Sequence, residues 1–430
     1  MKESVQRLLT TGASLLAQSA MACGALPAAW PLSSPVLEDL AECGPPEAES
    51  TVLDLVDRFA QIDDPRQARW VEHPLPAVLA LCAGAVVAGM RSFTAIASWV
   101  SDISVDLLAG LYARCDLALA ASRPPSKGTI WRVVTDIDPA QADAAIGTWL
   151  LHRASRPSAS GDNPAEDASP GLRELALDGK TLRGAKDSEG NQVHLLAAMT
   201  HTGLVAGQVE VGAKTNEIPM LSELLDDLDI NASVITADAL HTQRDTAEYL
   251  HQRGAEFCFC VKENQPKLFT TLDALPWTDV PIAHTRTDRG HGRLERRTIR
   301  VLPAPHDLPF PHVQQVTLIE RYVSDLKGNL QSAIAVLGVT SLTSKQADPA
   351  RLADLTRHHW GIESLHWLRD TLYREDQSQV RTRSGPRVMA GLRNLAIGAI
   401  RLIGRTDITE TTRWASRSMQ RPFQILDLSW

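Results

Sequence analysis

The sequence predicts an α/β protein in which a small all-helical domain precedes a mixed β-sheet. The chain up to residue 153 is rich in alanine and has helical rather than alternating periodicity. After residue 171, short apolar strands alternate with amphipathic helices. Between the two lies a stretch rich in Ser, Pro, Gly, Ala and acidic residues, 154–171, which is typical of a flexible linker.

Size and composition support a multidomain globular protein. A chain of 430 residues is too long for one ordinary core, and 44% hydrophobic with 22% charged residues exclude a disordered or fibrous class. No apolar run approaches eighteen residues, so we expect no membrane span. Residues 1–50 are expected to form a helical N-terminal extension rather than a secretory signal, because polar residues interrupt the apolar run. The six cysteines are scattered, which indicates free thiols in a reducing cytoplasm.

The charge is unevenly distributed. The formal net charge is −8, yet residues 351–430 carry more Lys and Arg than Asp and Glu. Within 286–300, six arginines face two acidic residues. Such a cluster suits contacts with phosphate, although a solvated hairpin face has the same composition. The segment 381–405 predicts a basic amphipathic helix that serves both as a core helix and as a phosphate-binding face.

The helical domain is expected over residues 51–153. The segments 74–90 and 92–103 contain helix formers without strand alternation. Further helix starts are indicated at Ser126 and at Asp138, which precedes a proline. A DNA-binding helix-turn-helix is one interpretation, but three short helices are a weak signal for it.

Residues 172–262 predict the order β-β-β-α-β-α-β. The expected elements are a strand closed by Asp178, two strands over 193–211, a helix over 216–228, a strand over 233–238, a helix over 242–253 and a strand over 256–262. If the first and fourth strands lie side by side, as in RNase H-like folds, Asp178 and Asp238 meet at one edge. Such carboxylates repel each other, and a divalent cation relieves the repulsion. Asp238 could instead cap the next helix.

A third carboxylate is predicted on a helix within 348–376. Its three- to four-residue periodicity places Glu363 on one face with His359 and His366. Those three residues could hold zinc. Alternatively, Glu363 joins the two aspartates in an all-oxygen site for Mg²⁺ or Mn²⁺, which three carboxylates from three elements favour. A third alternative is that the histidines simply pack.

Six motifs in series resemble one family. They are "ALDGKTLRGA" (176–185), "GAKTNEIP" (212–219), "TADALHTQ" (236–243), "VKENQPKL" (261–268), "HGRLERR" (291–297) and "HWGIESLHWLRDTLYREDQSQVR" (359–381). Together they resemble the DD(E) transposases of the ISAs1 group, in the IS4-like clan, which includes the H-repeat-associated proteins. Residues 59–89 are similar to the helical domain that accompanies that transposase domain. The resemblance covers roughly residues 55–405.

The resemblance implies an RNase H-like catalytic core over 172–405, with a β-rich insertion at about 265–345 and a C-terminal tail at 406–430. It implies that Asp178, Asp238 and Glu363 are the catalytic and metal-binding triad for two Mg²⁺ or Mn²⁺ ions. It also implies transposon-end and target DNA as partners and a homodimer on DNA. No membrane partner is expected, and the location would be the bacterial cytoplasm, at the nucleoid when DNA is bound.

The sequence departs from the clan at its Tyr, Arg, Glu, Lys signature. The matching positions hold Thr356, His359, Glu363 and Asp370. The contact with the transposon-end phosphate is therefore open, and three nearby arginines are available for it: Arg357, Arg369 and Arg374.

Ten residues are candidate DNA contacts because cations, amides and imidazoles suit the DNA backbone. They are Lys180, Arg183, His241, Lys262, Asn264, Gln265, Arg293, Arg297, Arg357 and His359. For several of them an ordinary structural role is the alternative: solvated loop charges, a hydrogen bond in a helix's first turn, or capping of a turn.

Three function classes follow. The first is a DNA transposase that cleaves donor ends and transfers strands with metal ions, which requires no Ser or Cys nucleophile. The second is a catalytically silent DNA-binding relative, although the sequence retains all three carboxylates. The third is a zinc-dependent hydrolase that uses the face formed by His359, Glu363 and His366.

Overall fold

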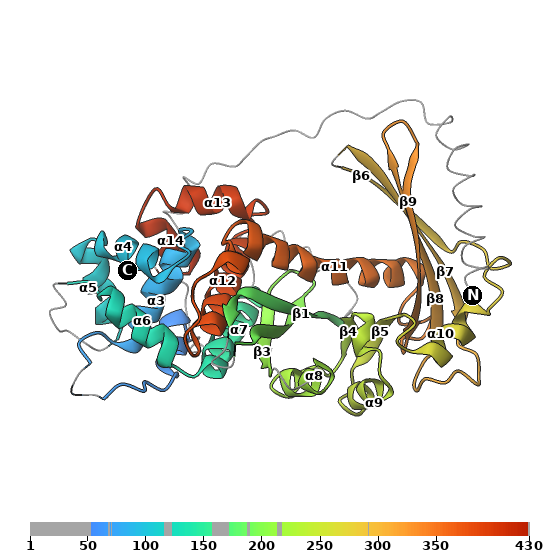
Figure 1. Cartoon of the computed structure of the whole chain (residues 1–430), viewed down its shortest axis with the longest axis horizontal. Coiled ribbons are helices and arrows are strands. Elements are labelled where there is room, and N and C mark those ends of the chain that lie inside the picture. Colours follow the sequence, from blue (N-terminus) through green and yellow to red (C-terminus); the bar gives the residue numbers. More distant parts are fainter. Residues whose placement is uncertain are drawn as a thin grey trace.

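The computed structural model describes residues 53–428, except 68, 70, 116–122, 157–171, 187–189, 213–216 and 291. The predicted N-terminal extension and most of the predicted linker therefore lie outside the described residues. The described chain forms a helical body at one end and a long sheet at the other, joined by one long helix (Figure 1).

The helical body combines both ends of the described chain. It contains α2 (Leu55–Ala60), α3 (Leu75–Val87), α4 (Phe93–Ser101), α5 (Val105–Ala113), α6 (Lys127–Asp136), α7 (Pro139–Ala154), α12 (Gly385–Leu402), α13 (Ile408–Ala415) and α14 (Gln420–Ile425). Side chains of Ser92, Ser104, Ser126 and Asp138 cap the helices that follow them. Nearly every residue of α3 is buried, as expected for a helix that is apolar on all sides.

The sheet begins with the predicted strand order. Its first strands are β1 (Arg173–Lys186), β2 (Gln192–Thr200), β3 (Val205–Val211), β4 (Ser233–Ala237) and β5 (Glu256–Val261), with α8 (Glu217–Asp226), η3 (Ala239–His241) and α9 (Arg244–Gln252) between them. The spatial order is β3-β2-β1-β4-β5, in which β1, β4 and β5 are parallel. The prediction that the first and fourth strands are neighbours is therefore confirmed. This is the mixed sheet that the resemblance to an RNase H-like core implied.

The strands predicted between residues 265 and 345 extend this same sheet. After α10 (Pro266–Asp273) come β6 (His284–Gly290), β7 (Arg293–Pro303), β8 (Gln315–Asp325) and β9 (Leu330–Thr340). Because β9 pairs antiparallel with β5, the sheet has nine strands in the order β3-β2-β1-β4-β5-β9-β8-β7-β6. The ends of β6 and β9 rise beside the long helix (Figure 1).

The long helix α11 (Pro349–Thr371) connects the two ends of the molecule. Its apolar residues Leu352, Leu355, Ile362 and Leu365 are buried. It packs on β1 and β4, on the face of the sheet opposite α8 and α9 (Figure 1). The helix is followed by η4 (Glu375–Gln377), which leads into α12.

The core role predicted for the helix within 381–405 is confirmed, but the arginines of α12 do not form a solvated, phosphate-binding face. Almost the whole of α12 is buried, including Arg393, which is 1% exposed. Arg387 Nε donates to Asp143 at 2.7 Å, and Arg401 bonds to the carbonyl of Gly203. The arginines of this helix therefore serve the core, because buried carboxylates and carbonyls compensate their charge.

Glu375 is the centre of a buried ionic network. Its carboxylate accepts from Arg369 Nε at 2.8 Å and from Arg393 Nη1 at 2.7 Å. Burial opposes ionisation, but the two guanidinium groups outweigh it and lower the pKa of Glu375 to about 2. The network ties the end of α11 to α12.

No single helix in the described ranges is both long and apolar enough to cross a membrane, although the bent pair of α4 and α5 passes by length and composition. Among the described residues, Cys82, Cys115, Cys258 and Cys260 form no disulfide.

Replacing Glu375 with Gln should destabilise the protein by about 3–5 kcal/mol, because two buried guanidinium groups lose their counter-charge. Urea unfolding followed by circular dichroism measures this. Glu263→Gln, at an exposed carboxylate, is the control and should stay within about 0.5 kcal/mol of the wild type. Equal midpoints for the two variants would show that the network contributes nothing.

Candidate active site

Two of the predicted carboxylates follow a pair of neighbouring strand residues. The parallel register of β1 with β4 ends at Leu177 and Ala237, so Asp178 and Asp238 come next on the two strands. The prediction that the first strand ends at Asp178 is wrong, since β1 continues to Lys186 by pairing with β2. Only the pairing with β4 ends there. Asp238 also caps η3, because its carboxylate accepts from Leu240 N at 3.0 Å.

The third carboxylate reaches the same place from α11. His359 Nδ1 lies 3.2 Å from Thr236 Oγ1 on β4, and His366 Nδ1 lies 3.4 Å from Asp178 Oδ2 on β1. Glu363 lies between these two histidines along the helix. Burial and the negative charge of Asp178 raise the pKa of Glu363. The carboxylates of Asp178 and Glu363 therefore act on each other, and those of Asp178 and Asp238 both act on His359.

The carboxylates of Asp178, Asp238 and Glu363 suit a hard divalent cation, but they do not lie close enough together to bind one. Carboxylate oxygens are what Mg²⁺ and Mn²⁺ prefer. Burial raises the pKa of Glu363 and the charge of Asp178 raises it further, and a cation would relieve that repulsion. No group of three or more His, Cys, Asp or Glu side chains within the described residues is close enough to hold an ion. The chemistry of the residues fits the implied metal, and their side chains would have to move to bind it.

The zinc alternative finds no support in the geometry. Its two histidines turn to different strands, His359 to Thr236 and His366 to Asp178. Burial lowers the pKa of His359, while Asp178 and Asp238 oppose that shift. The histidines therefore contact the carboxylate site rather than each other.

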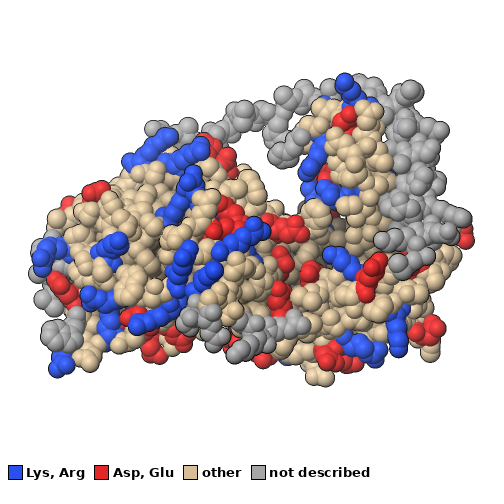
Figure 2. Space-filling view, in the orientation of Figure 1, with Lys and Arg blue, Asp and Glu red and all other residues tan. Residues whose placement is uncertain are grey.

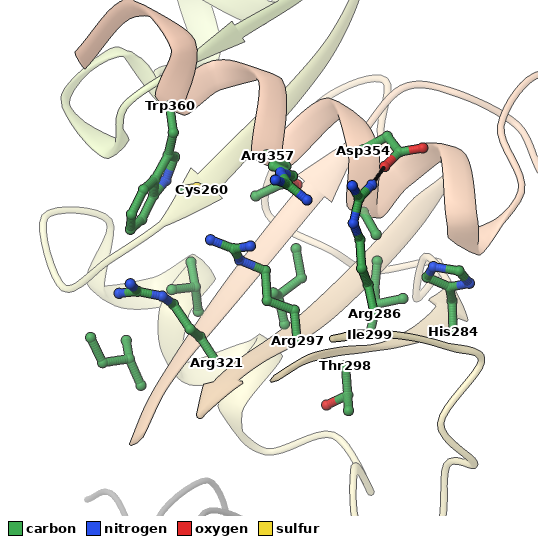
Figure 3. Close-up of a pocket in the computed structure, with 15 residues that line it drawn as sticks. Cys260, His284, Arg286, Arg297, Thr298, Ile299, Arg321, Asp354, Arg357 and Trp360 are labelled. Atoms are coloured by element: carbon green, nitrogen blue, oxygen red, sulfur yellow. Dashed lines mark hydrogen bonds and ion pairs between the residues drawn. The ribbon is translucent and has the colours of Figure 1, made fainter. Parts of the chain in front are cut away.

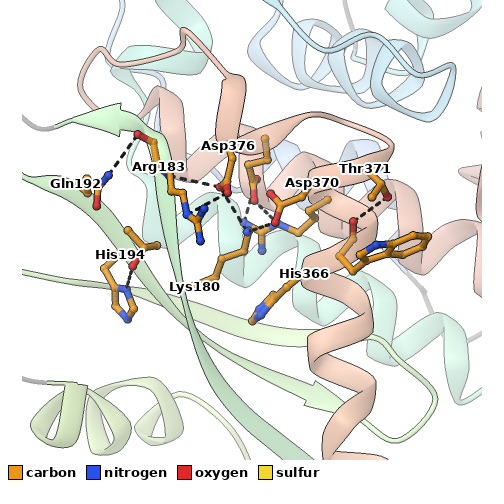
Figure 4. A network of polar contacts seen from close by, with 12 residues as sticks. Lys180, Arg183, Gln192, His194, His366, Asp370, Thr371 and Asp376 are labelled. Atoms are coloured by element: carbon orange, nitrogen blue, oxygen red, sulfur yellow. Dashed lines mark hydrogen bonds and ion pairs between the residues drawn. The ribbon is translucent and has the colours of Figure 1, made fainter. Parts of the chain in front are cut away.

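Lys180 is buried and does not face solvent. Its Nζ lies 2.6 Å from Asp370 Oδ2 and 3.6 Å from Asp376 Oδ1 (Figure 4). The prediction that Lys180 contacts DNA is therefore corrected, because its charge is already compensated inside the protein. Asp370 stands where the IS4-like clan has a cation, and here Lys180 supplies the opposite charge from β1. Arg183 remains exposed, with Nε 3.4 Å from Asp376 Oδ2.

His241 is also buried, at 1% exposure, so its predicted contact with DNA is corrected. Its Nε2 lies 3.3 Å from Glu217 Oε2, and His194 Nε2 lies 2.6 Å from Glu217 Oε1. A Cβ at Gly179 would lie only 2.6 Å from His194 Nε2, so this cluster requires the glycine that follows Asp178. Sequence reasoning gave Glu217 no role, although it lies in one of the quoted motifs.

In the segment after β5, Asn264 and Gln265 form hydrogen bonds within the protein, whereas the preceding Lys262 is exposed. Asn264 Nδ2 donates to the carbonyl of Ala239 at 2.6 Å, and Gln265 Nε2 donates to Gln243 at 2.7 Å. These amides connect the segment to the loop that carries Asp238. Lys262 is exposed, and its charge opposes the rise in the pKa of Glu363.

An arginine-lined pocket lies between α11 and strands β6 to β9. Arg286, Arg297, Arg321 and Arg357 approach Trp360 and Asp354 there (Figure 3). Asp288 pairs with Arg357 Nη1 at 2.8 Å and with Arg297 Nη1 at 3.4 Å. Burial, together with Arg357 and Arg321, lowers the pKa of Arg297. Arg293 is exposed near the tip of β7, whereas Arg300 pairs with Glu320.

Residues 169–398 match the family described as "Transposase DDE domain", and residues 56–150 match the one described as "DDE_Tnp_1-associated". The first match covers more than half of the chain. The protein therefore belongs to the transposase DDE domain family. That family generally uses divalent metal ions.

The relatives confirm the resemblance to the H-repeat-associated proteins. The chain is 30% identical over 370 residues to the protein YbfL of Escherichia coli K12, covering 80% of this chain and 90% of that one. It is 29% identical to the H repeat-associated protein YhhI of the same organism, with the same coverage. Among solved structures, piggyBac transposase in a synaptic complex with hairpin DNA matches with a TM-score of 0.39 and 11% identity, over 88% of this chain and 82% of that chain. That similarity is too low to carry an argument.

The pH dependence of stability should reveal the Glu217 cluster. The imidazoles of His194 and His241, which lie against the carboxylate, lower the pKa of Glu217 to about 2, below about 4.3 in an unfolded chain. Its contribution is therefore complete above pH 4.3 and is lost as the pH falls towards 2. Glu217→Gln should have a lower free energy of unfolding than the wild type at pH 6. This difference between the two proteins should be smaller at pH 3.

Urea unfolding at several pH values between 6 and 3 measures the difference in free energy of unfolding between Glu217→Gln and the wild type. Glu223→Gln, at an exposed position on the same helix, is the matched control and should show no such pH-dependent difference. A difference of constant size for Glu217→Gln would contradict the role assigned to its charge.

Proposed function

We propose that the protein is an active DNA transposase that cleaves the ends of its insertion sequence and joins them to target DNA. Membership of the transposase DDE domain family supports the general activity. The observation that supports the proposal most directly is that Asp178 and Asp238 follow the last paired residues of β1 and β4, while the charge of Asp178 acts on Glu363 of α11.

The three carboxylates would hold Mg²⁺ or Mn²⁺, two ions in all. Such ions activate the attacking oxygen, stabilise charge on the phosphorus and assist the leaving 3′-oxygen. The chain's own residues orient the carboxylates. His366 lies against Asp178, the capping bond fixes Asp238, and Lys262 places a positive charge near Glu363.

The surface around the site suits a DNA partner. Figure 2 shows acidic side chains at the bottom of a hollow between the rising strands and the rest of the molecule, with Lys and Arg on both sides. Metal ions would neutralise the acidic floor, and the basic flanks would contact phosphates. Candidate contacts that remain exposed or partly exposed are Arg183, Lys262, Arg293, Arg297, Arg357 and His359. A homodimer on DNA, at the nucleoid in the cytoplasm, belongs to the same proposal.

The second candidate function is that of a DNA-binding relative of the transposases that has no catalytic activity. It keeps the DNA contacts and differs only in the chemistry, so cleavage by the purified protein distinguishes it. The zinc hydrolase is not proposed further, because its two histidines face different strands.

Replacing Glu363 with Gln should abolish both donor cleavage and strand transfer, because the amide lacks the charge that a divalent cation requires. Asp178→Asn and Asp238→Asn should behave alike. All three variants should still bind end DNA, since other residues contact phosphates. Gel assays with linear DNA that carries the element's ends, with and without Mg²⁺, measure both steps.

His366→Ala is the discriminating control for the zinc alternative, and it should retain measurable Mg²⁺-dependent cleavage. Full activity of the Glu363 variant, or complete loss in the His366 variant alone, would overturn the assignment of the third carboxylate. Binding of end DNA by the wild type without any cleavage would favour the silent relative.

DNA affinity should depend strongly on salt despite the net charge of −8. With about six phosphate contacts, log affinity against log salt should have a slope of about −5. Arg293→Gln should make the slope shallower by about 1, whereas Arg244→Gln, on the opposite face of the sheet in α9, should leave it unchanged. A slope near zero for the wild type would rule out these arginines as contacts.

A further inference from the structure

The turn that follows Asp238 is too short to fix its own position. η3 spans only Ala239–His241, and Asp238 is its N-cap. A single 3₁₀ turn has few internal hydrogen bonds, so neighbouring elements have to hold it. The strand pairing of β4 with β1 and with β5 does not reach it, because both ladders end at Ala237. Side chains therefore determine where Asp238 lies relative to Asp178.

A chain of side-chain contacts joins β1 to η3 beyond the last strand pair. Thr181 Oγ1, on β1, lies 2.8 Å from His194 Nδ1 on β2. His194 Nε2 lies 2.6 Å from Glu217 Oε1 on α8, and Glu217 Oε2 lies 3.3 Å from His241 Nε2 on η3. These contacts begin and end three residues after each of the two aspartates. The Glu217 cluster thus connects the two segments that carry them.

The cluster also packs against the backbone beside Asp178. A Cβ on Gly179 would lie 2.6 Å from His194 Nε2 and 2.8 Å from Glu217 Oε1. His194 and Glu217 therefore fill the space that any side chain at the position after Asp178 would need. At the other end, His241 is 1% exposed, so protein atoms rather than water surround its imidazole.

Other contacts hold η3 from the side of β5. Asn264 Nδ2 donates to the carbonyl of Ala239 at 2.6 Å, and Thr242 Oγ1 donates to the carbonyl of Cys260 at 2.6 Å. In the sheet, β5 lies on the side of β4 that faces away from β1. Of all these contacts, only those of the Glu217 cluster lead to β1.

Glu217 is the charged partner of His241. Both nitrogens of this imidazole are buried without a hydrogen bond among the described residues, and Nε2 faces the Glu217 carboxylate. The two imidazoles lower the pKa of Glu217 to about 2, so the carboxylate is ionised at neutral pH. A buried polar group without a partner costs free energy. Removing the carboxylate would therefore release the turn.

We propose that Glu217 is a positioning residue for the metal site, which holds the turn after Asp238 at a fixed separation from Asp178 through His194 and His241. The inference rests on the proposed function, because that function assigns both aspartates to the metal ions. Residues that orient metal ligands from outside change metal affinity about 10- to 100-fold when they are removed. A cluster that only stabilised the fold would leave that affinity unchanged.

Hydrogen exchange of the full chain in EDTA, followed by mass spectrometry, tests the positioning without metal. The N–H groups of residues 240–243 are hydrogen-bonded within the turn. In Glu217→Ala, a peptide that covers them should exchange about 10-fold faster, because the turn loses its contact with a charged group. Glu223→Ala, exposed on the same helix, should exchange like the wild type. Unchanged exchange in Glu217→Ala would overturn the proposal.

Mn²⁺ alone is the probe for the metal site, since the electron paramagnetic resonance signal of the free ion falls as it binds. Glu217→Ala should weaken Mn²⁺ binding about 10- to 100-fold at a temperature at which the variant is folded. Phe59→Leu, in the core of the helical body, lowers the unfolding midpoint and should keep the wild-type affinity. Faster exchange in Glu217→Ala with an unchanged Mn²⁺ affinity would show a structural role alone.

A double-mutant cycle distinguishes a connected chain from independent contacts. His194 lies on β2, so its effect on η3 passes through Glu217. His194→Ala should weaken Mn²⁺ binding in the wild type and cause no further loss in Glu217→Ala. Losses that multiply in the double variant would contradict the chain.

Failure of the proposed function gives a different result. If the wild type neither binds Mn²⁺ nor cleaves end DNA, while Glu217→Ala still accelerates exchange in η3, the metal site is rejected and the positioning of the turn stands. Cleavage by the wild type with unchanged exchange in Glu217→Ala rejects the positioning alone.

Discussion

The parallel pairing of β1 with β4 stops at Leu177 and Ala237, and the geometry of the site depends on where it stops. β1 continues along β2, while β4 turns into η3, so the two strands separate directly beyond the last pair. Two aspartates follow that pair. A shift of one residue would turn one of them to the opposite face of the sheet. Hydrophobic burial of the strands therefore sets the distance between charged groups.

α11 packs on β1 and β4 at the site and connects the sheet to the helical body. Its buried leucines and Ile362 hold it on the sheet, and the ionic network at Glu375 holds its end against α12. The helix thus has little freedom to rotate, which keeps Glu363 facing Asp178. The repulsion among the carboxylates is tolerated because packing elsewhere supports the helix. The same packing leaves open to solvent the stripe of α11 that carries Glu363, Trp360 and Trp367.

Local charge balance explains which cations are available to DNA. Lys180, Arg369, Arg387 and Arg393 are compensated by buried or partly buried carboxylates. Arg183, Lys262 and Arg293 are exposed. A basic stretch of sequence therefore does not by itself define a phosphate-binding surface, since the core of this protein uses arginine as well. Lys180 on β1 forms an ion pair with Asp370, the helix position at which the clan signature has a cation.

The sequence by itself determined the order of the strands along the chain and the helix of Glu363, because apolar periodicity is a local signal. The pairing of the first and fourth strands was expected only by analogy with RNase H-like folds. The sequence also led to the family, through six motifs in order. It did not reveal that β1 runs past Asp178, that the arginines of α12 are buried, or that Glu217 joins two histidines. Those features depend on partners as far as 244 residues away along the chain. Only the tertiary structure decided them, because burial and pairing of a charge are properties of the folded surroundings and not of the local sequence.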